Sequence, residues 1–311
     1  MNSSITAPDV PAAGSQAPAA SSVFRHTVLT ALAPLSWGTT YLVTTEWLPP
    51  DRPLLAGALR SLPAGLLVLA VARRLPRGVW WAKAATLGLL NIGVFFALLF
   101  VAAYRLPGGL AATLGAAQPL AVAANASLLL GERPSRWRLG WAAAGILGVA
   151  LMVLGPGAHA DPLGIVAGLG GTVSMSIGVV LTRRWGNPVG PVAFAGWQLT
   201  AGGLFLLPLA LLVEGAPPRL APAAIGGYAW LGLVGALLAY TVWFRGIGRL
   251  PVTAVSFLTL LSPVVATVLG WTVLGQSLTP IQSIGFVVAL AAVLAAQLRP
   301  GDVVALRRRT R

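Results

Sequence analysis

The sequence predicts an all-α integral membrane protein in which ten transmembrane helices form two inverted five-helix repeats. Three observations predict this fold class: the composition, a series of long apolar segments, and an internal repeat. Of the 311 residues, 57% are hydrophobic and only 9% are charged. A water-soluble domain has about a quarter charged residues, so this chain has too little polar surface to coat a soluble protein.

Ten apolar segments follow one another between short clusters of Arg, Pro and Gly. A helix that crosses the hydrocarbon layer of roughly 30 Å takes about 20 residues. Continuous apolar runs favour helices over barrel strands, because barrel strands alternate in polarity. The expected spans are 27–47, 54–72, 84–103, 108–130, 137–155, 162–182, 190–213, 223–244, 252–274 and 280–298.

The two ends of the chain differ from the apolar segments. The first 24 residues are rich in Ala, Pro and Ser and show no apolar period, which is typical of disorder. A cleaved signal peptide is the alternative, but the apolar run after Arg25 is short before Pro34 interrupts it. The predicted division is a disordered cytoplasmic tail at 1–24, a first five-helix repeat at 25–155, a second, inverted repeat at 156–298, and a basic cytoplasmic tail at 299–311.

Basic residues predict the orientation in the membrane. If the amino terminus lies inside, the inner connections carry 17 of the 21 Lys and Arg residues, and the outer ones carry only Arg52, Arg105 and Arg219. Cytoplasmic loops are enriched in Lys and Arg, so we expect a multi-pass protein of the cell (plasma or inner) membrane with both termini in the cytoplasm. The same distribution accounts for the net charge of +14 without a nucleic-acid partner.

Two stretches of the chain align with each other without a gap. RLPGGLAATLGAAQPLAVAANASLLLGE begins at Arg105, and RLPVTAVSFLTLLSPVVATVLGWTVLGQ begins at Arg249, an offset of 144 residues. Because each unit holds five spans, the second copy must cross the membrane in the opposite sense. Such inverted repeats can expose a central site to either face in turn. A second overlay, at an offset of 138, places Arg60 opposite Gln198.

Several motifs keep a fixed order along these spans. They are Trp-Gly at 37–38, Arg60 followed by small residues at 64–65, a mid-span proline and an LGE ending at 130–132 in the fourth span, the matching proline and LGQ ending in the ninth, and AYTVWFRGIGRLP at 239–251. The chain thereby resembles the two EamA repeats of the drug/metabolite transporter superfamily. The resemblance implies a secondary transporter that exports amino acids, related small metabolites or drugs by alternating access. Gln276 stands where the motif usually has Glu, which puts in doubt any role that needs a charge at both repeat ends.

Arg60 is the one charged residue expected well inside a span. A cation there costs about 2.5–3.5 kcal/mol on insertion scales, so it should face water or a partner. One interpretation is an anchor for a substrate carboxylate or phosphate. The other is a structural role, with the guanidinium bonded to backbone carbonyl groups, and the sequence leaves both open.

Polar and aromatic residues in other spans complete the candidate site. Asn and Gln in apolar helices more often join helices than bind ligand, and the deeper aromatic side chains can serve packing as well as line a pocket. The candidates for substrate binding are Trp37, Thr40, Tyr41, Arg60, Asn91, Phe95, Gln118, Trp197, Gln198, Tyr240, Trp243 and Ser262. Two prolines, Pro119 and Pro263, are candidates for helix breaks or gating, because each leaves a backbone carbonyl without its helical partner.

Catalytic and metal-binding residues are sparse. The chain has no cysteine, and its two histidines lie near a span boundary and in a loop, so we expect no metal and no cofactor. An intramembrane enzyme would need a nucleophile with a base, paired aspartates or a metal motif, and the sequence contains none of them. We expect no enzyme; a non-transporting membrane scaffold is the other alternative. The sequence leaves open whether the protein is a monomer or a homodimer.

The acidic residues limit how transport could be driven. All seven fall in the tail, in loops or at span ends, so no buried carboxylate offers a conventional proton relay. The sequence also lacks the phosphate-binding loop that ATP would need. A small-molecule substrate would therefore move down its own gradient, or with coupling through Glu46, Glu132 or its own charge.

Overall fold

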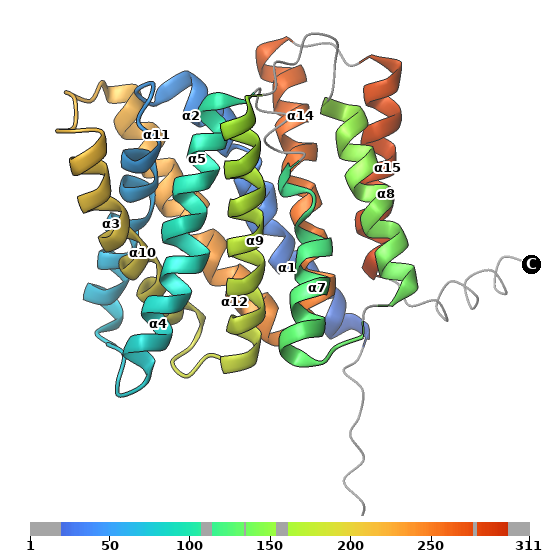
Figure 1. The fold of residues 1–311 in the computed structure, drawn as a ribbon, viewed down its shortest axis with the longest axis horizontal. Helices are drawn as coiled ribbons and strands as arrows, with labels where there is room; N and C mark the ends of the chain where they lie inside the picture. The colour runs from blue at the N-terminus through green and yellow to red at the C-terminus, as the bar shows by residue number, and fades with distance from the viewer. Residues whose placement is uncertain (1–19, 107–113, 134, 154–160, 276–278, 298–311) are drawn as a thin grey trace, which may run out of the picture.

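The computed structural model describes residues 20–106, 114–133, 135–153, 161–275 and 279–297. Within these ranges the chain consists of helices and short connections, without a strand (Figure 1). The helices are α1 (Ala20–Trp37), α2 (Thr40–Trp47), α3 (Pro53–Ala72), α4 (Trp80–Gly88), α5 (Phe95–Arg105), α7 (Gln118–Leu130), α8 (Arg136–Val153), α9 (Pro162–Trp185), α10 (Pro191–Val213), α11 (Pro222–Gly232), α12 (Ala239–Arg249), α13 (Val252–Phe257), α14 (Leu261–Leu274) and α15 (Pro280–Gln297). Two π-helical turns, η1 (Leu89–Val94) and η2 (Leu233–Leu238), join α4 to α5 and α11 to α12, and a 3-10 turn, η3 (Leu258–Leu260), joins α13 to α14.

Six helical segments are long and apolar enough to cross a membrane. They are Pro53–Ala72, Trp80–Arg105, Pro162–Trp185, Pro191–Val213, Pro222–Arg249 and Val252–Val273. Two shorter apolar helices are Gln118–Leu130 and Pro280–Ala296. The all-helical membrane fold is therefore confirmed for the described residues, while the number of ten spans stays a prediction.

The structure extends and divides some predicted segments. The helix α1 begins at Ala20, so the last five residues of the predicted tail are helical, because helix formation continues past the apolar run into Ala and Ser. The rest of that tail, and all of the tail predicted at 299–311, lie outside the described residues. The first predicted span breaks after Trp37: at Gly38 a Cβ atom would lie 2.5 Å from the Cβ of Val265 in α14, so this close approach requires glycine.

The helices α3 and α10 form an antiparallel pair with reciprocal contacts. The backbone N–H of Leu54 at the start of α3 donates to the carboxylate of Glu214 after α10. A Cβ at Gly65 would meet Thr200, and a Cβ at Gly203 would meet Leu62. At an offset of 138 residues, Gly65 corresponds to Gly203 and Leu62 corresponds to Thr200. The two contacts are therefore images of each other, as expected for a local two-fold axis between the helices.

The helices α8 and α15 lie side by side at the right of Figure 1 and repeat this relation at the other offset. A Cβ at Gly148 would meet Ala289, and a Cβ at Gly145 would meet Ala292. At an offset of 144, each of these contacts is the image of the other. Two helix pairs thus carry two-fold-related contacts at the offsets that the sequence repeats show.

The corners at Arg105 and Arg249 lie at opposite ends of α9. Arg105 forms an ion pair of 2.9 Å with Asp161, which precedes α9, while Arg183 in its last turn donates to the carbonyl oxygen atoms of Ile247 and Gly248, next to Arg249. A helix of 24 residues is about 36 Å long. We call the end with Asp161 and Glu214 the acidic end, and the end with Arg183 and Arg249 the basic end.

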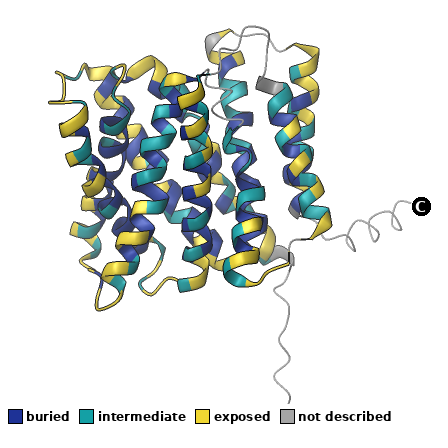
Figure 2. Ribbon diagram, viewed as in Figure 1, coloured by how far each residue is buried: buried dark blue, intermediate teal, exposed yellow. Residues whose placement is uncertain are grey.

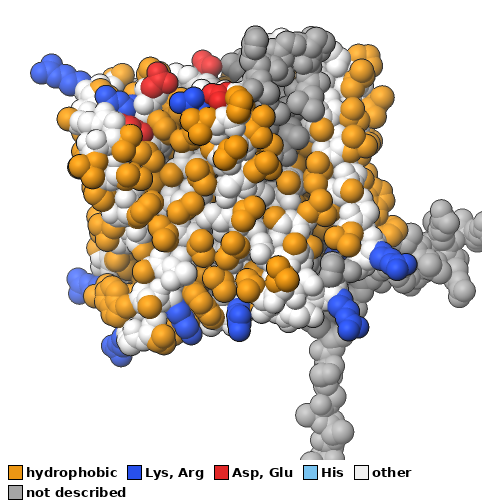
Figure 3. All heavy atoms as spheres, viewed as in Figure 1, with side chains coloured by type: hydrophobic (Ala, Val, Ile, Leu, Met, Phe, Trp, Pro, Cys, Tyr) orange, Lys and Arg blue, Asp and Glu red, His pale blue; other side chains and the backbone are white. Residues whose placement is uncertain are grey.

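The outer surface of the bundle is apolar. Exposed residues follow the outward faces of the helices (Figure 2), and hydrophobic side chains cover the middle of the molecule between its two ends (Figure 3). In the same view Lys and Arg side chains line the lower edge, while the upper edge carries Asp and Glu side chains together with further Lys and Arg. An apolar band between two polar edges is what a lipid bilayer requires. Which end faces the cytoplasm stays a prediction.

Candidate functional site

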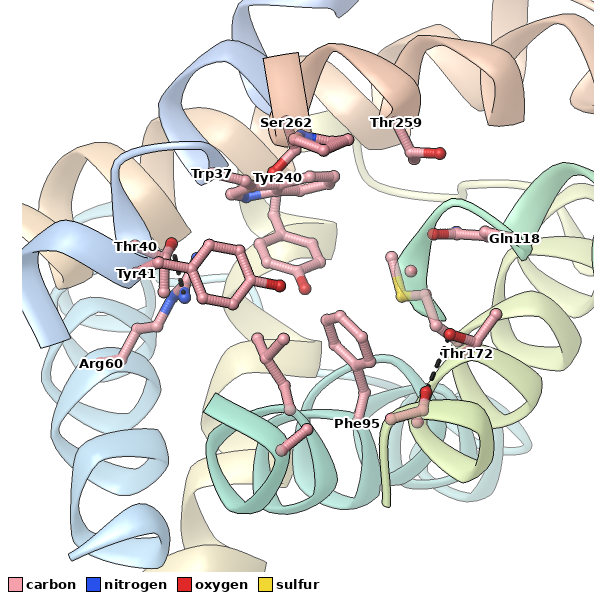
Figure 4. Close-up of a pocket in the computed structure, with 17 residues that line it drawn as sticks. Trp37, Thr40, Tyr41, Arg60, Phe95, Gln118, Thr172, Tyr240, Thr259 and Ser262 are labelled. Carbon is pink, nitrogen blue, oxygen red and sulfur yellow. Dashed lines mark hydrogen bonds between the residues drawn. The ribbon is translucent and has the colours of Figure 1, made fainter. Parts of the chain in front are cut away.

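A cavity lies among helices of both predicted repeats. About 80 Å³ of it is open to the centres of water molecules, which is room for several waters or part of a small solute. Figure 4 shows side chains that line it from α1, α2, α3, α5, α7, α9, α12, η3 and α14. Its lining is Trp37, Thr40, Tyr41, Arg60, Phe95, Leu99, Ala102, Gly115, Gln118, Gly168, Gly171, Thr172, Met175, Tyr240, Thr259, Ser262 and Pro263.

Arg60 lies at the wall of this cavity and is only 2% exposed. Its Nη1 donates to the hydroxyl of Thr40 at 3.2 Å, and its Nη2 donates to the carbonyl of Gly235 at 2.9 Å. The guanidinium carbon lies 4.7 Å from the centre of the Phe96 ring, a cation–π contact. The Nε of Arg60 is buried without a hydrogen-bond partner.

No carboxylate neutralises Arg60 within the part of the chain that the structure describes, where the one ion pair joins Arg105 to Asp161. A buried charge without a counter-charge is costly and is normally paired or bound to a ligand. The site therefore has a fixed positive charge, and the buried Nε–H of the same guanidinium is without a partner.

The partner of Arg60 is supplied by a π-helical turn. In η2 the helix widens, and the carbonyl of Gly235 accepts hydrogen bonds from Arg60 and from the Nε1 of Trp37, each at 2.9 Å. A Cβ at Gly235 would lie 3.3 Å from the Nη2 of Arg60, so the small residue also lets the guanidinium approach. Single π turns inside α-helices are frequent at functional sites.

The turn η1 lies 144 residues before η2 and contacts Gln198, the residue of the second repeat that corresponds to Arg60. Its Asn91 corresponds to Gly235, and the Nδ2 of Asn91 donates to the Oε1 of Gln198 at 2.7 Å. Asn91 and Gln198 are both fully buried, and neither of them lines the cavity. The sequence proposed both as substrate ligands; the structure places them as a bond between helices.

Aromatic rings form one wall of the cavity. The ring of Trp37 lies 5.3 Å from that of Tyr240 and 5.1 Å from that of Trp243, in tilted and edge-on arrangements. In Figure 4 the hydroxyl groups of Tyr41 and Tyr240 point toward the open space, and the Tyr240 hydroxyl donates to the carbonyl of Asn91 at 3.3 Å. Trp243 packs behind this wall, without reaching the cavity.

The two prolines lie at corresponding helix starts. Pro119 is in the first turn of α7, and Pro263 is in the first turn of α14, which follows the 3-10 turn η3. At the start of α7 Pro119 needs no helical partner for its missing N–H, whereas Pro263 follows the helical residues of α13 and η3 and leaves a carbonyl of that turn without its partner. Gln118 and Ser262, the residues before them, both line the cavity, and Pro263 does as well, whereas Pro119 lines a separate small cavity.

Eight of the twelve predicted substrate residues line the cavity, and the remaining four do not. Trp197 lies near the start of α10, close to the basic end, and its Nε1 donates to the carbonyl of Arg74. Sequence reasoning also missed lining residues, among them Thr172, Met175 and Thr259. Thr259 could have been found, since it precedes Ser262 by three residues, one helical turn on the same face, and corresponds to Gly115 in the first repeat.

The described residues contain no group of three or more His, Asp or Glu side chains that could hold a metal ion. The chemistry of the cavity is instead that of a cation, hydroxyl and amide groups, and aromatic rings. Such a set can hold a small solute with an anionic group and an apolar body, through charge-assisted hydrogen bonds and ring contacts.

Known proteins resemble this chain over most of its length. The model of the EamA-like transporter family matches residues 26–154 and 162–296. Protein PecM of Dickeya dadantii (strain 3937) is 43% identical over 267 residues, which cover 85% of this chain and 90% of that protein. The uncharacterized inner membrane transporter YedA of Escherichia coli (strain K12) is 30% identical over 268 residues, which cover 83% and 86%.

A more distant relative and a solved structure extend this similarity. A probable amino-acid metabolite efflux pump of Salmonella typhimurium is 27% identical over 276 residues, covering 85% of this chain and 91% of that protein. A crystal structure that is 21% identical superposes with a TM-score of 0.73 and covers 88% of this chain and 96% of its own. At that identity the superposition supports the fold alone.

Proposed function

Because the chain belongs to the EamA-like transporter family, we propose that it exports amino acids or related small metabolites by alternating access. Membership makes the protein a transporter of a small molecule in a lipid bilayer; the substrate class, the direction and the mechanism are the proposal. The observation that carries it is Arg60, a buried cation at the wall of a cavity, with no carboxylate partner among the described residues.

The charge of Arg60 favours a substrate with an anionic group. A carboxylate in the cavity would receive the free Nε–H of Arg60 and would neutralise the buried guanidinium. Gln118 also lines the cavity, and its Nε2, buried without a partner, is the second donor that we propose for the substrate. The rings of Trp37 and Tyr240 would pack on the apolar part of the substrate.

The relation between the two halves supports alternating access. Reciprocal contacts in α3 with α10 and in α8 with α15 fit two copies related by a two-fold axis. The corners at Arg105 and Arg249 lie at opposite ends of α9, as an inverted repeat requires. We propose ten crossings in two inverted units, with the basic end and both termini in the cytoplasm.

The relatives favour export of a metabolite. The Salmonella typhimurium protein is described as a probable amino-acid metabolite efflux pump. An amino acid carries the carboxylate that Arg60 would bind, and its side chain would lie among the rings. If an acidic residue couples transport to an ion gradient, the candidates are Glu132 and Glu46. Glu132 lines a small cavity near the basic end together with Arg133 and Arg138, and Glu46 is exposed.

An efflux assay with Arg60 variants tests the proposal. We expect Arg60→Gln to lower export of the accepted amino acid by about 10- to 100-fold, the worth of one charge-assisted hydrogen bond, and Arg60→Lys to retain part of it. Arg136→Gln, the same change at an exposed position of α8, is the matched control and should transport normally. Full activity of both Arg60 variants at normal membrane levels would remove the anchor role.

Ligand-dependent thermal shifts separate the competing functions. Amino acids and related carboxylates should raise the melting temperature of the detergent-solubilised protein, and this shift should vanish in Arg60→Gln. A cationic aromatic drug that stabilises both proteins equally would instead favour a drug exporter that uses the aromatic wall. A protein that no small molecule stabilises and that supports no efflux would be a scaffold.

A further inference from the structure

A groove at the basic end carries a second concentration of positive charge. It lies between the connection from α3 to α4 and the first turns of α10, and about 690 Å³ of it is open to water-sized groups. Three arginines, Arg73, Arg74 and Arg77, line it together with Trp80, Trp81 and Trp197. Arginine guanidinium groups beside indole rings form a surface that suits an anion attached to an apolar body.

The stretches of sequence that form the groove contain no acidic residue that could neutralise the charge of these arginines. The sequence has no Asp or Glu between residues 52 and 131 or between 162 and 213, the stretches that contain both sides of the groove. The one ion pair within the described ranges lies at the opposite, acidic end of α9. Lys83 adds a fourth cation nearby, with its Nζ 4.9 Å from the centre of the Trp80 ring.

The backbone conformation at Arg73 is unusual for an arginine. Arg73 ends α3 in the left-handed region, with φ 48° and ψ 32°, while its N–H donates to the carbonyl of Leu69. This conformation costs an ordinary residue roughly 1 kcal/mol, and helices usually place glycine there. Gly131 and Gly275 fill this position at the ends of α7 and α14. Arg73 thus stands in a position where these two helices have glycine.

The groove is held in shape by a buried tryptophan. Trp197 of α10 is 4% exposed, and its Nε1 donates to the carbonyl of Arg74 at 2.6 Å. The connection after α3 is thereby fixed to a helix of the second repeat, while the side chains of the three arginines are exposed and open to a ligand. This contact gives Trp197 a place in the groove instead of the central cavity.

The rim of the groove is apolar and exposed. Leu75, Val79 and Trp81 are 57%, 63% and 57% exposed, immediately beside the arginines. A soluble anion would leave these side chains in water, whereas a lipid would cover them with its glycerol and acyl region. Tryptophan near a membrane boundary favours the same level of the bilayer, where headgroups lie.

We propose that this groove binds the phosphodiester headgroup of an anionic phospholipid. The guanidinium groups of Arg73, Arg74 and Arg77 hold the phosphate oxygens, and the acyl chains lie against Leu75 and Val79. Basic pockets between transmembrane helices bind anionic headgroups in this way. The lipid bridges the α3–α4 connection and α10, and so stabilises the packing of one repeat on the other.

Lipid titration of the purified protein tests the site. We expect phosphatidylglycerol, added to delipidated protein in neutral detergent, to raise the melting temperature, and phosphatidylcholine at the same concentration to leave it unchanged. Glycerol 3-phosphate, which has a phosphate without acyl chains, should also leave it unchanged. A shift of equal size with glycerol 3-phosphate would assign the groove to a soluble phosphate and overturn the lipid assignment.

Variants locate the binding. The combined change Arg73→Asn, Arg74→Gln and Arg77→Gln removes three charges, and asparagine tolerates the left-handed backbone at position 73. Each arginine near an anionic surface contributes about a fivefold increase in affinity. The triple variant should therefore bind phosphatidylglycerol about a hundredfold more weakly. The control removes the exposed charges of Arg133, Arg136 and Arg245, and should bind as the unchanged protein does.

A separate substitution tests the support of the groove. Trp197→Phe keeps a large ring and all charges but removes the N–H donor to Arg74, so phosphatidylglycerol should bind several-fold more weakly. Equal weakening in the triple variant and in its control would show diffuse attraction to net charge, which overturns the proposal. Equal stabilisation by phosphatidylglycerol and phosphatidylcholine would overturn it as well.

Discussion

The two repeats build the same contact from different residues. In the first, Arg60 of α3 donates to the backbone carbonyl of Gly235 in η2; in the second, Gln198 of α10 accepts from the side chain of Asn91 in η1. The two pairs correspond residue by residue at offsets of 138 and 144. One contact leaves a buried charge in the wall of the cavity, and the other pairs neutral amides away from it. Each contact also contains buried polar atoms without a partner, the Nε of Arg60 in the first and the Oδ1 of Asn91 and Nε2 of Gln198 in the second.

This difference indicates how a duplicated fold acquires an asymmetric site. The packing role is common to both contacts: each joins the second helix of one repeat to a π turn in the third helix of the other. The charge is present on one side only, so substrate recognition can concentrate in the contact at Arg60, while the contact at Gln198 retains the structural role. The predictions below test this division of roles.

Placing a cation in the second contact should have the largest effect on stability. Gln198→Arg introduces a second buried charge. Arg60 has a backbone carbonyl as partner and lines a cavity, whereas an arginine at position 198 would have only the amide of Asn91 beside it and no cavity. We expect a loss of about 2.5–3.5 kcal/mol, the cost of an arginine inside the membrane. Thermal unfolding in detergent and the amount of protein in the membrane measure it.

The reverse change supplies the comparison. Arg60→Gln removes a buried charge while keeping an amide that can donate to Gly235, so its stability should stay within about 1 kcal/mol of the unchanged protein. If Gln198→Arg were as stable as Arg60→Gln, the two contacts would be interchangeable, and the division of roles between the repeats would be wrong.

Adding a methyl group beside each contact should separate them further. At Gly178 a Cβ atom would clash with the Oδ1 of Asn91, whose side chain is buried and bonded to Gln198. Gly178→Ala should therefore cost about 1–3 kcal/mol through overpacking. A melting curve that matches that of the unchanged protein would show that the contact in η1 is loosely packed.

Gly235→Ala is the matched change at the other contact. The nearest atom to its Cβ would be the Nη2 of Arg60 at 3.3 Å, at the end of a flexible side chain. We expect stability to change by less than about 1 kcal/mol, while efflux falls because the guanidinium must shift. Normal efflux from Gly235→Ala would indicate that the position of Arg60 is not critical for transport.

The sequence alone predicted the membrane fold and many of the residues that line the cavity, because both predictions depend on the order of residue types along the chain rather than on contacts. Hydropathy predicts helices, and an isolated arginine in an apolar run predicts a partner or a cavity, which is where Arg60 lies. The repeat offset of 144 also relates η1 to η2 and the left-handed end of α7 at Gly131 to that of α14 at Gly275.

The rest depends on contacts that no pattern in the sequence encodes. The extra residue that widens η1 and η2 leaves hydropathy unchanged, so the carbonyl of Gly235 could not be foreseen as the partner of Arg60. Asn91 and Trp197 carry polar groups that suit a ligand or another helix equally well, and only packing decides between them. Thr172 is a small hydroxyl in a glycine-rich helix, without a signal that separates it from a packing residue.

A double-mutant cycle should show a smaller effect within the second contact. Asn91→Ala, Gln198→Ala and the double variant give the coupling free energy between the two amides, which we expect to be about 0.6 kcal/mol and at most about 1.7 kcal/mol. The hydrogen bond between Asn125 and Ser176, also 2.7 Å, is the control pair. A coupling near zero at 91 and 198 alone would mean that this contact does not hold the repeats together.

The smallest effect is expected from the charges at the two corresponding corners, Arg105 and Arg249, which also differ between the repeats. Arg105 is paired with Asp161, whereas its counterpart Arg249 is at the basic end, beyond the reach of that carboxylate. The hydrogen bond from Arg105, with a second from the backbone of Leu163, lowers the pKa of the Asp161 carboxyl. A lowered pKa stabilises the folded protein above the ordinary carboxyl pKa, and this contribution is lost as the pH falls through the lowered value.

Two variants distinguish the ion pair at this corner from the helix cap. Asp161→Asn keeps an acceptor for Leu163 and removes the charge, so it should remove the contribution that titrates in acid and change the melting temperature at neutral pH very little, because the carboxylate is exposed. Asp161→Ala also removes the cap of α9 and should lower the melting temperature slightly further at every pH. If Asp161→Asn destabilised the protein as much as Asp161→Ala at neutral pH, the ion pair rather than the cap would hold this corner, and the two repeats would differ in their loops as well as in their central contacts.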